Sequence, residues 1–493
     1  MAGGKVKKGF FFYLLIFFIL IAAFVGVCVV IMLFNPGKNV LGFQYFNNGA
    51  THEIVTTTDE SETALKLGET SYESIEIDAG PAQVVIENNQ NYDKHSIVIV
   101  NNSKGFVLSD QSQLFEYSVT IEGDILTGKK LKIDLISSEG FLNFSKDIQV
   151  RVHFADVSIE GQQKVFESFE NTAVKIKTTS GNVLIGGNKN PGYSADISPK
   201  SIDVETDSGN ITISSHAKNT YDNISLSTKS GTINLLEQTN LIAEKGDVKL
   251  NIGNGKLKAK AINDNVQILA DDATIEVEDI SGNVDISCRT SIIDINNITG
   301  NLNFAEGSEV MNASKVYIDK VGGFVNVLQA RDSDIYITEI GGSVNIHTTS
   351  GYVRLGSEEK LLKGTIFVET LNGQIDTFFG ESNNARFLVS ENGKINAYFG
   401  DAVVGNRNKF SSNEGDLSVS FKGSSKVKFV FDITNPTNEN KFDLKNVKFD
   451  ILDGKALQDN PYYHNCNEES KDGTIKIITN KSITLELIAE QVG

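Results

Sequence analysis

The chain has 493 residues, of which 40% are apolar, so it is long enough to bury a substantial core. Glycine is frequent at 43 residues, proline is scarce at 6, and valine, isoleucine, threonine and asparagine recur throughout, which favours strands joined by tight turns. The formal net charge of -18 repels phosphate backbones and no basic stripe opposes it, so nucleic acid is not expected as a partner. We therefore expect an all-β protein.

An uncharged apolar run lies close to the N-terminus. Residues 10–34 carry no charge, and a helix of that length, at about 1.5 Å per residue, exceeds the roughly 30 Å thickness of the hydrocarbon layer. Lys5, Lys7 and Lys8 precede the run, whereas only Lys38 follows it closely. By the positive-inside rule, residues 1–9 form a cytoplasmic tail, 10–34 a transmembrane helix in the cell membrane, and the remainder an extracytoplasmic domain.

Two other readings of this run are weaker. A cleaved signal peptide has a shorter apolar region and a small-x-small site, which the exit Asn35-Pro36-Gly37-Lys38 lacks. A lipoprotein anchor at Cys28 would require a small residue where Val27 stands. We therefore predict an uncleaved single-pass anchor, followed by a polar linker or stalk over residues 35–70 with little sustained alternation.

Residues 71–169 alternate apolar and polar residues, as in SIEIDAGPAQVVIE, but lack a repeated turn. They are expected to form an N-terminal β-domain or cap, because an uncovered end of a stacked array invites aggregation. Residues 426–493 contain similar runs, such as VKFVFDI, and are expected to form a C-terminal β cap.

Between these caps the chain repeats one short pattern. Residues 202–214, IDVETDSGNITIS, read apolar-x-apolar, four spacer residues, glycine, and then apolar-x-apolar again. Asn263-Asp264-Asn265 substitutes for one of the turns, since asparagine and aspartate tolerate the left-handed backbone that glycine otherwise supplies. The structural turns of the repeat are Gly181, Gly209, Gly231, Gly246, Gly282, Gly300, Gly323 and Gly342, with weaker copies at Gly351, Gly373, Gly393 and Gly415.

A repeat spacing of about 20 residues indicates stacked units rather than separate domains. A pair of short strands is not stable alone, but stacking joins the apolar faces into one core and pairs the backbones. We predict a β-solenoid or closely related stacked-strand array over residues 170–425. An antiparallel sandwich of hairpins is the alternative, although the constant four-residue spacer favours a fixed corner in each coil.

The stretch SIEIDAGPAQVVIE followed by copies of the TxSGN turn resembles the bacterial "toastrack" adhesin domain family, over about residues 71–425. Members of that family are β-repeat modules attached to membrane segments. The resemblance implies a role in adhesion or in envelope stress, and it brings no catalytic residue or cofactor with it. The number of repeats here exceeds the family's pattern.

Candidate chemistry is sparse in the sequence. A polysaccharide-active β-helix enzyme needs clustered acids, and the best pair, Asp271-Asp272, would share a site only at a turn. Asp207, Asp247 and Asp416 lie at turns but lack the spacing of a calcium loop. We expect these acids to be solvated turn residues, and no metal site or cofactor.

Two further motifs are weak. The segment 123–130, GDILTGKK, nearly spells a phosphate loop but lies between two alternating stretches and lacks the serine or threonine that holds magnesium. His464-Asn465-Cys466 offers two metal ligands only. Cys288 is expected to be buried and unpaired.

Tryptophan is absent, which removes one common platform for sugars, although Tyr193, Tyr352 and Tyr398 could serve. Tyr462, Tyr463 and His464 follow a proline in a polar loop and are the best exposed contact candidates. The sequence thus predicts a non-catalytic bacterial surface adhesin that binds a surface glycan or protein ligand. An envelope scaffold or stress-response protein and a polysaccharide-active enzyme are the alternatives.

Overall fold

In the computed structural model the chain forms two compact units, Met1–Pro199 and Lys200–Gly493. The all-β prediction, with one apolar helix near the N-terminus, is confirmed. The structure describes residues 8–34, 39–40, 43–46, 50–56, 72–88, 96–101, 104–108, 116–122, 129–136, 142–145, 148–154, 172–186, 199–214, 220–237, 241–304, 311–400, 405–422, 427–432, 442–445, 463–466, 473–479 and 483–488.

The first unit begins with helix α1, Lys8–Phe34. Its segment Tyr13–Phe34 is long and apolar enough to cross a membrane, judged by length and composition. Most of its large apolar side chains are exposed, including Phe34 at 82%, so the protein itself does not cover them. The helix is therefore a candidate membrane span, and its orientation stays a prediction.

The segment predicted as a linker contains strands. These strands are short, and their backbone partners come from later in the chain. Strand β3 (Ala50–Thr56) pairs antiparallel with β6 (Ser96–Asn101), which pairs antiparallel with β11 (Ile148–Phe154). A second antiparallel sheet has the order β1 (Asn39–Val40), β2 (Phe43–Phe46), β7 (Lys104–Leu108) and β10 (Leu142–Ser145).

The rest of the first unit contains parallel pairings. Gly80 adopts a positive φ of 51° at the turn between β4 and β5, a backbone conformation that glycine allows at low cost. Strand β4 (Tyr72–Gly80) lies parallel to β9 (Lys129–Ile136) and β12 (Ala173–Thr178), β5 (Gln83–Asn88) lies parallel to β11 and β13 (Val183–Ile185), and β8 (Glu116–Glu122) is antiparallel to β9.

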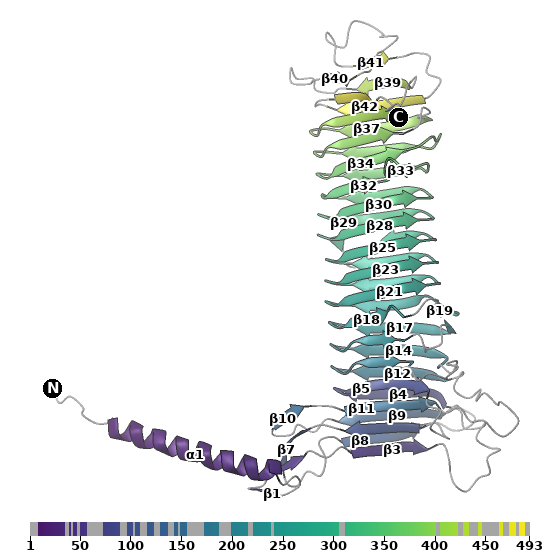
Figure 1. Ribbon diagram of the computed structural model, residues 1–493. Coiled ribbons are helices and arrows are strands. Elements are labelled where there is room, and N and C mark those ends of the chain that lie inside the picture. The colour runs from purple at the N-terminus through teal and green to yellow at the C-terminus, as the bar shows by residue number, and fades with distance from the viewer. Residues whose placement is uncertain are drawn as a thin grey trace, which may run out of the picture. The chain divides into compact units, whose positions relative to one another are not determined.

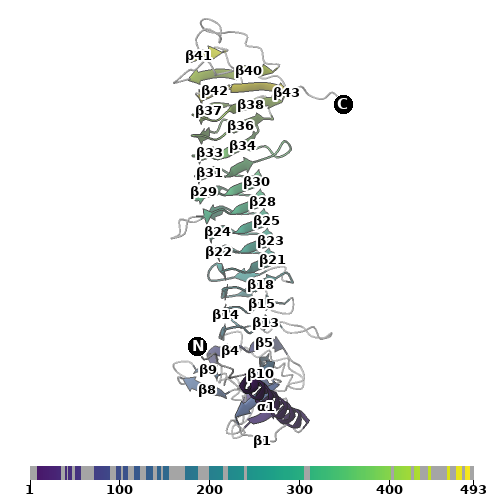
Figure 2. The same cartoon turned by 90° about the vertical axis from the view of Figure 1, so that its left-hand side faces the viewer.

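The second unit is a β-solenoid of two facing parallel sheets, which Figures 1 and 2 show as stacked strands. The predicted β-solenoid is confirmed and the alternative, a sandwich of hairpins, is wrong, because equivalent strands of successive coils pair in parallel. Sheet I contains β14 (Ser201–Thr206), β17 (Asn223–Thr228), β20 (Val248–Ile252), β22 (Val266–Ala270), β24 (Val284–Cys288), β26 (Leu302–Phe304), β27 (Met311–Asn312), β29 (Val325–Arg331), β31 (Val344–Thr348), β33 (Ile366–Thr370), β35 (Arg386–Ser390) and β37 (Gly405–Ser412).

Sheet II faces sheet I across the core, as the side view in Figure 2 shows. Its strands are β15 (Ile211–Ile213), β18 (Thr232–Leu235), β21 (Lys256–Ile262), β23 (Thr274–Ile280), β25 (Ile292–Ile298), β28 (Lys315–Val321), β30 (Asp334–Ile340), β32 (Tyr352–Leu355), β34 (Gln374–Phe379), β36 (Ile395–Phe399) and β38 (Leu417–Lys422). A small parallel pair, β16 (Thr220–Tyr221) and β19 (Ile242–Ala243), flanks the first coils.

The described residues of the predicted C-terminal cap region form five strands. At the end of sheet I, β42 (Gly473–Thr479) continues β37 in parallel, followed by β39 (Val427–Asp432) and the antiparallel β41 (Tyr463–Cys466). At the end of sheet II, β43 (Ile483–Ile488) continues β38 and pairs in parallel with β40 (Phe442–Lys445). The order in space thus differs from the order in sequence.

The core follows directly from the alternation. Apolar residues at every second position face inward, so that Ile224, Val248 and Val266 lie in register on successive strands and are at most 1% exposed. Some inward positions carry polar side chains, such as Asn408, and one of those in the described part of the core is charged. Arg386 is fully buried, with its guanidinium 4.9 Å from the ring centroid of Phe379 and 5.6 Å from that of Phe399, and it donates a 2.6 Å hydrogen bond to the carbonyl of Gly380.

The repeated glycines occupy two different corners of the coil. At the first corner, where sheet I leads to sheet II, Gly209 and Gly231 follow β14 and β17. At the second corner, where sheet II leads back to sheet I, Gly246 and Gly282 precede β20 and β24. Gly342 and Gly351 flank the same strand, β31. Gly342 and Gly351 lie close together in the sequence because they belong to different corners of the coil.

Backbone crowding explains glycine at the first corner. A Cβ atom at Gly231 would lie 1.9 Å from the carbonyl oxygen of Gly209 in the preceding coil. Thr228 completes the corner: its buried hydroxyl accepts a 2.8 Å hydrogen bond from the Gly231 N–H and donates to the Gly209 carbonyl at 3.2 Å. The TxSGN motif therefore satisfies buried backbone groups within and between coils.

Buried serines replace this arrangement where the first corner lacks glycine. The Ser291 hydroxyl donates to the Asp271 carbonyl at 3.1 Å and accepts from the Ala273 N–H at 3.3 Å. At the second corner, asparagines bridge successive coils: the Asn265 side-chain carbonyl accepts from the Asn283 N–H at 2.8 Å, and Asn283 does the same for Asn301 at 3.0 Å. Each corner thus has its own hydrogen-bonded ladder.

Alanine substitution should distinguish crowded from open turns. Gly231→Ala is expected to lower the free energy of unfolding by about 1–3 kcal/mol, because the new methyl group overlaps a backbone carbonyl. Gly246→Ala is the matched control, since its Cβ would meet nothing closer than the Asn223 side-chain oxygen at 3.4 Å, and it should change stability by less than about 0.5 kcal/mol. Urea midpoints followed by circular dichroism measure both, and equal shifts would contradict the crowding argument.

Candidate binding surface on the outer face of sheet I

The outer face of sheet I is hollowed along its length. One groove of about 700 Å³ crosses strands β17 to β29, and a second of about 560 Å³ crosses strands β29 to β37. We call them the N-terminal groove and the C-terminal groove. Leu328 on β29 lines both, so the two hollows follow one another on the same face. Their floor consists of the outward side chains of parallel strands, which the register aligns in columns.

The N-terminal groove is lined by amides, hydroxyls and apolar side chains, together with one lysine and one aspartate. Gln267, Asn303 and Asn326 contribute amide groups to one column, in which Asp285 lies between Gln267 and Asn303 and accepts a 2.9 Å hydrogen bond from the Asn303 amide. Leu269, which is 50% exposed, adds an apolar surface among these polar groups. Polar groups that alternate with small apolar surfaces suit a ligand with hydroxyls and C–H faces.

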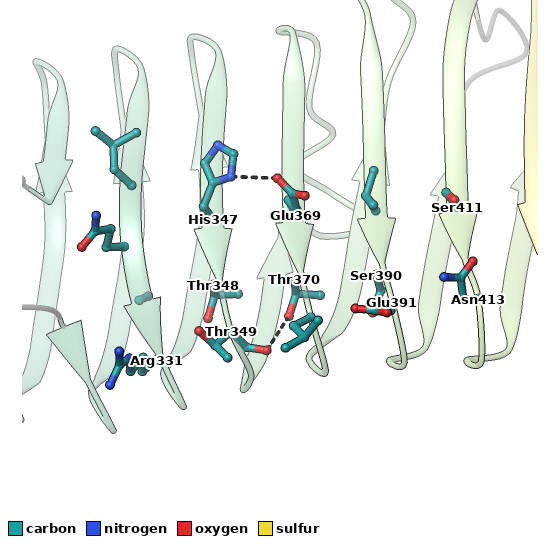
Figure 3. Close-up of a pocket in the computed structure, with 15 residues that line it drawn as sticks. Arg331, His347, Thr348, Thr349, Glu369, Thr370, Ser390, Glu391, Ser411 and Asn413 are labelled. Atoms are coloured by element: carbon teal, nitrogen blue, oxygen red, sulfur yellow. Dashed lines mark hydrogen bonds and ion pairs between the residues drawn. The ribbon is translucent and has the colours of Figure 1, made fainter.

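The C-terminal groove contains a hydrogen-bonded chain of side chains (Figure 3). His347 Nδ1 lies 3.0 Å from Glu369 Oε2, and His347 Nε2 lies 3.1 Å from the Asn345 side-chain oxygen. The Asn345 amide in turn donates to Asn326 at 3.0 Å, which connects the two grooves. These contacts fix the orientation of the imidazole on the groove floor.

Two carboxylates line the C-terminal groove. Figure 3 places Glu369 beside His347, whereas Glu391 lies next to Ser390 at the strand end, so the two groups lie at different heights along neighbouring strands. A general acid and base must both reach one substrate bond, and these carboxylates do not point toward a common centre.

The acids proposed from sequence lie at corners. Asp271 and Asp272 follow β22, and Arg289 from the next coil contacts both, with its Nη2 3.0 Å from Asp272 Oδ2. The hydrogen bond from Arg289 holds the pKa of Asp271 below its usual value. Asp207 lies 2.5 Å from Lys229 Nζ, and Asp247 accepts a 2.5 Å hydrogen bond from Gln267.

These corner acids therefore serve contacts between coils. Among the described residues, no group of three or more histidine, cysteine, aspartate or glutamate side chains could hold a metal ion. Asp416 follows the corner glycine Gly415, and its backbone carbonyl accepts a 3.0 Å hydrogen bond from the Ile395 N–H.

Several predicted contact residues lie outside the described part of the structure. Tyr193 and Tyr462 belong to this group, as do residues 123–128 of the apparent phosphate loop. Tyr463 and His464 lie on β41, where only the backbone pairing with Asp432 and Phe431 is described. Their role in contacts stays a prediction.

Sequence reasoning missed most of an aromatic cluster on the outer face of sheet II. Tyr317 and Tyr336 stack with ring centroids 5.0 Å apart and an interplanar angle of 12°, and Tyr352 packs edge-on to Tyr336 at 5.3 Å. The sequence predicts stacking only for Tyr352 in this cluster, and for Tyr398, which packs against Phe378 with ring centroids 5.4 Å apart. The signal was present, since tyrosine occupies the same outward position in KVYIDKV and DIYITEI.

No family model and no curated protein matches the chain. Among solved structures, a "putative cell adhesion protein from Clostridium sporogenes" is similar over 90% of this chain and 99% of that chain, with 9% sequence identity and a TM-score of 0.16. A TM-score this low supports no conclusion about fold or function. The resemblance to the toastrack family therefore stays a prediction, while the β-repeat architecture rests on the structure itself.

Cys288 should be chemically inert in the native protein. The thiol is 3% exposed, and burial raises its pKa to about 11. At pH 8 only about one thiol in a thousand is then ionised, so alkylation at Cys288 should be slow. Peptide mapping after iodoacetamide treatment should show this residue modified only in the presence of denaturant, and native labelling at the rate of a free thiol would contradict its burial.

Proposed function

We propose that the protein is a membrane-anchored adhesin of the cell surface that binds an extended glycan along the outer face of sheet I and performs no chemistry on it. The observation that carries this proposal is the pair of grooves that share Leu328 and together extend from β17 to β37. A ligand that follows both grooves must itself be extended, because the floor is a ladder of strands about 4.8 Å apart.

The N-terminal groove carries one lysine and one aspartate beside its amides and hydroxyls, which favours a polar ligand without net charge. Amide groups from Gln267, Asn303 and Asn326 can both donate and accept hydrogen bonds, as glycan hydroxyls require. Leu269 and Leu328 provide apolar surface for the C–H faces of sugar rings. Each coil contributes little binding energy, so affinity comes from contacts repeated along the rod and from many copies on one cell.

The anchor belongs to the same proposal. Helix α1 holds the chain in the cell membrane, and the solenoid lies outside the cell, where it can reach a surface ligand. A scaffold without a ligand would not need a groove of this extent. An enzyme would need carboxylates that converge on one bond, and the arrangement of Glu369 and Glu391 favours binding instead.

Protease accessibility tests the location. In intact cells that carry the full chain with a C-terminal tag, added protease should remove the tag, because the proposed topology exposes everything after α1. A second version with the tag at the N-terminus is the control and should stay protected until lysis. Protection of the C-terminal tag in intact cells would refute the surface location and favour a scaffold beneath another membrane.

Substitution at the shared position tests the groove. The full chain in lipid nanodiscs is screened on a glycan array, and Leu328→Arg should weaken binding of any positive glycan at least about tenfold, because it places a long charged side chain in both grooves. Thr212→Arg introduces the same side chain on β15 of sheet II and should change affinity by less than about twofold. Equal losses, or no glycan bound by the wild type, would contradict the proposal.

A further inference from the structure

The outer face of sheet II carries a column of side chains whose charges are opposite at its two ends. Asp294, Tyr317, Tyr336 and Arg354 are register partners on the successive strands β25, β28, β30 and β32. The two tyrosines stack at the middle of the column. The column therefore reads acid, aromatic, aromatic, base along the rod.

A neighbouring column on the same strands has the same symmetry. Ile292, Lys315 and Asp334 are register partners, and Tyr352 follows on β32, where its N–H donates to the Asp334 carboxylate at 2.9 Å. This column reads apolar, base, acid, aromatic. If a second copy of either column is inverted about the midpoint between β28 and β30 and laid against the first, each charged residue lies opposite a residue of the other sign. Each apolar or aromatic residue then lies opposite another apolar or aromatic residue.

The end charges of the first column are available for a partner. Within the part of the chain that the structure describes, neither Asp294 nor Arg354 forms an ion pair, and both are exposed. The Arg354 guanidinium lies over the ring of Phe378, 5.3 Å from its centroid. Tyr317 is 40% exposed and Ile292 is 49% exposed, so apolar surface accompanies the charges.

We propose that this face binds a second copy of the same chain in antiparallel orientation. The two-fold axis lies in the interface, parallel to the strands and midway between β28 and β30. Asp294 then lies opposite Arg354 of the second copy, and Tyr317 lies opposite its Tyr336. A two-fold interface requires such self-complementarity, in which residue i meets residue j and residue j meets residue i.

The second column fits the same axis independently. Lys315 lies opposite Asp334 of the second copy, and Ile292 lies opposite its Tyr352. Tyrosine and arginine are also the residue types that contribute most to protein interfaces. Both columns are complementary about the same midpoint, which a two-fold axis requires and the binding of a glycan does not. This shared midpoint therefore favours a second copy over a sugar ligand.

Complementarity ends beyond these strands. On the next strand at each end, Glu276 would face Asp376 of the second copy, although Glu276 already contacts Lys256 and Lys258, and Asp376 accepts hydrogen bonds from Gln374 and other neighbours. The contact is therefore small and belongs to the weak, transient class of interface. It should also weaken with salt, because its charges are exposed.

The antiparallel arrangement has a consequence for adhesion. In the paired second units, Lys200 of one copy and Lys200 of the other lie at opposite ends of the contact, so the two chains enter from opposite directions. Such a pair suits chains that approach one another from different surfaces. The pairing face on sheet II is separate from the proposed glycan groove on sheet I, so the two chains can associate whether or not a glycan binds.

Complementary charge reversal tests the proposal. Full-length chain in separate donor-labelled and acceptor-labelled nanodiscs is titrated, and energy transfer measures association between discs. Asp294→Arg and Arg354→Asp should each weaken self-association at least about tenfold. In a pair of identical variant chains, both contacts between residue 294 of one copy and residue 354 of the other then join charges of the same sign. Mixing donor discs of one variant with acceptor discs of the other should restore association to within about threefold of wild type, because both opposed pairs become attractive again.

The mixture also controls for folding, since a misfolded variant cannot regain binding from its partner. Thr212→Arg, on β15 and outside the patch, should associate like wild type. Absence of energy transfer with the wild-type chain, wild-type association of either single variant, or failure of the mixture to recover would each overturn the proposal.

Discussion

The solenoid depends on close backbone approach at its corners. Parallel strands of successive coils can keep their register only if the chain reverses direction within a few residues, and at Gly231 this brings a backbone carbonyl within 1.9 Å of where a Cβ would lie. Glycine removes that obstacle, and the Thr228 hydroxyl satisfies the backbone groups that the sharp corner would otherwise leave buried without partners. Where glycine is missing, small buried residues such as Ala273 and Ser291 take its place.

Fixed corners divide the side chains into two classes with different freedom. Inward positions must pack against the coils above and below, so they are almost uniformly apolar, and the buried Arg386 requires the rings of Phe379 and Phe399 around it. Outward positions are constrained only by their neighbours in the same column. Function can therefore vary along these columns without a change of fold.

The two outer faces use this freedom differently. Sheet I presents amides, hydroxyls and scattered leucines in hollows that follow the rod, which suits an extended polar ligand. Sheet II presents the stacked Tyr317 and Tyr336 between charges of opposite sign, which suits a second copy. The two surfaces face in opposite directions, so a molecule could use both at once.

The sequence by itself determined the all-β class, the apolar helix, the repeat and the turn residues, because alternation and glycine turns are local signals. It even contained the tyrosine column, in equivalent positions of neighbouring repeats. The sequence could not assign each glycine to one of the two corners, since both corners use the same local pattern. It also could not identify the strands between residues 39 and 56, because their partners come from far along the chain. Only the tertiary structure decided the parallel register, because hydrogen bonds between coils set it. That register gathers Gln267, Asn303 and Asn326 on one groove floor and places Asp294 and Arg354 at opposite ends of one column.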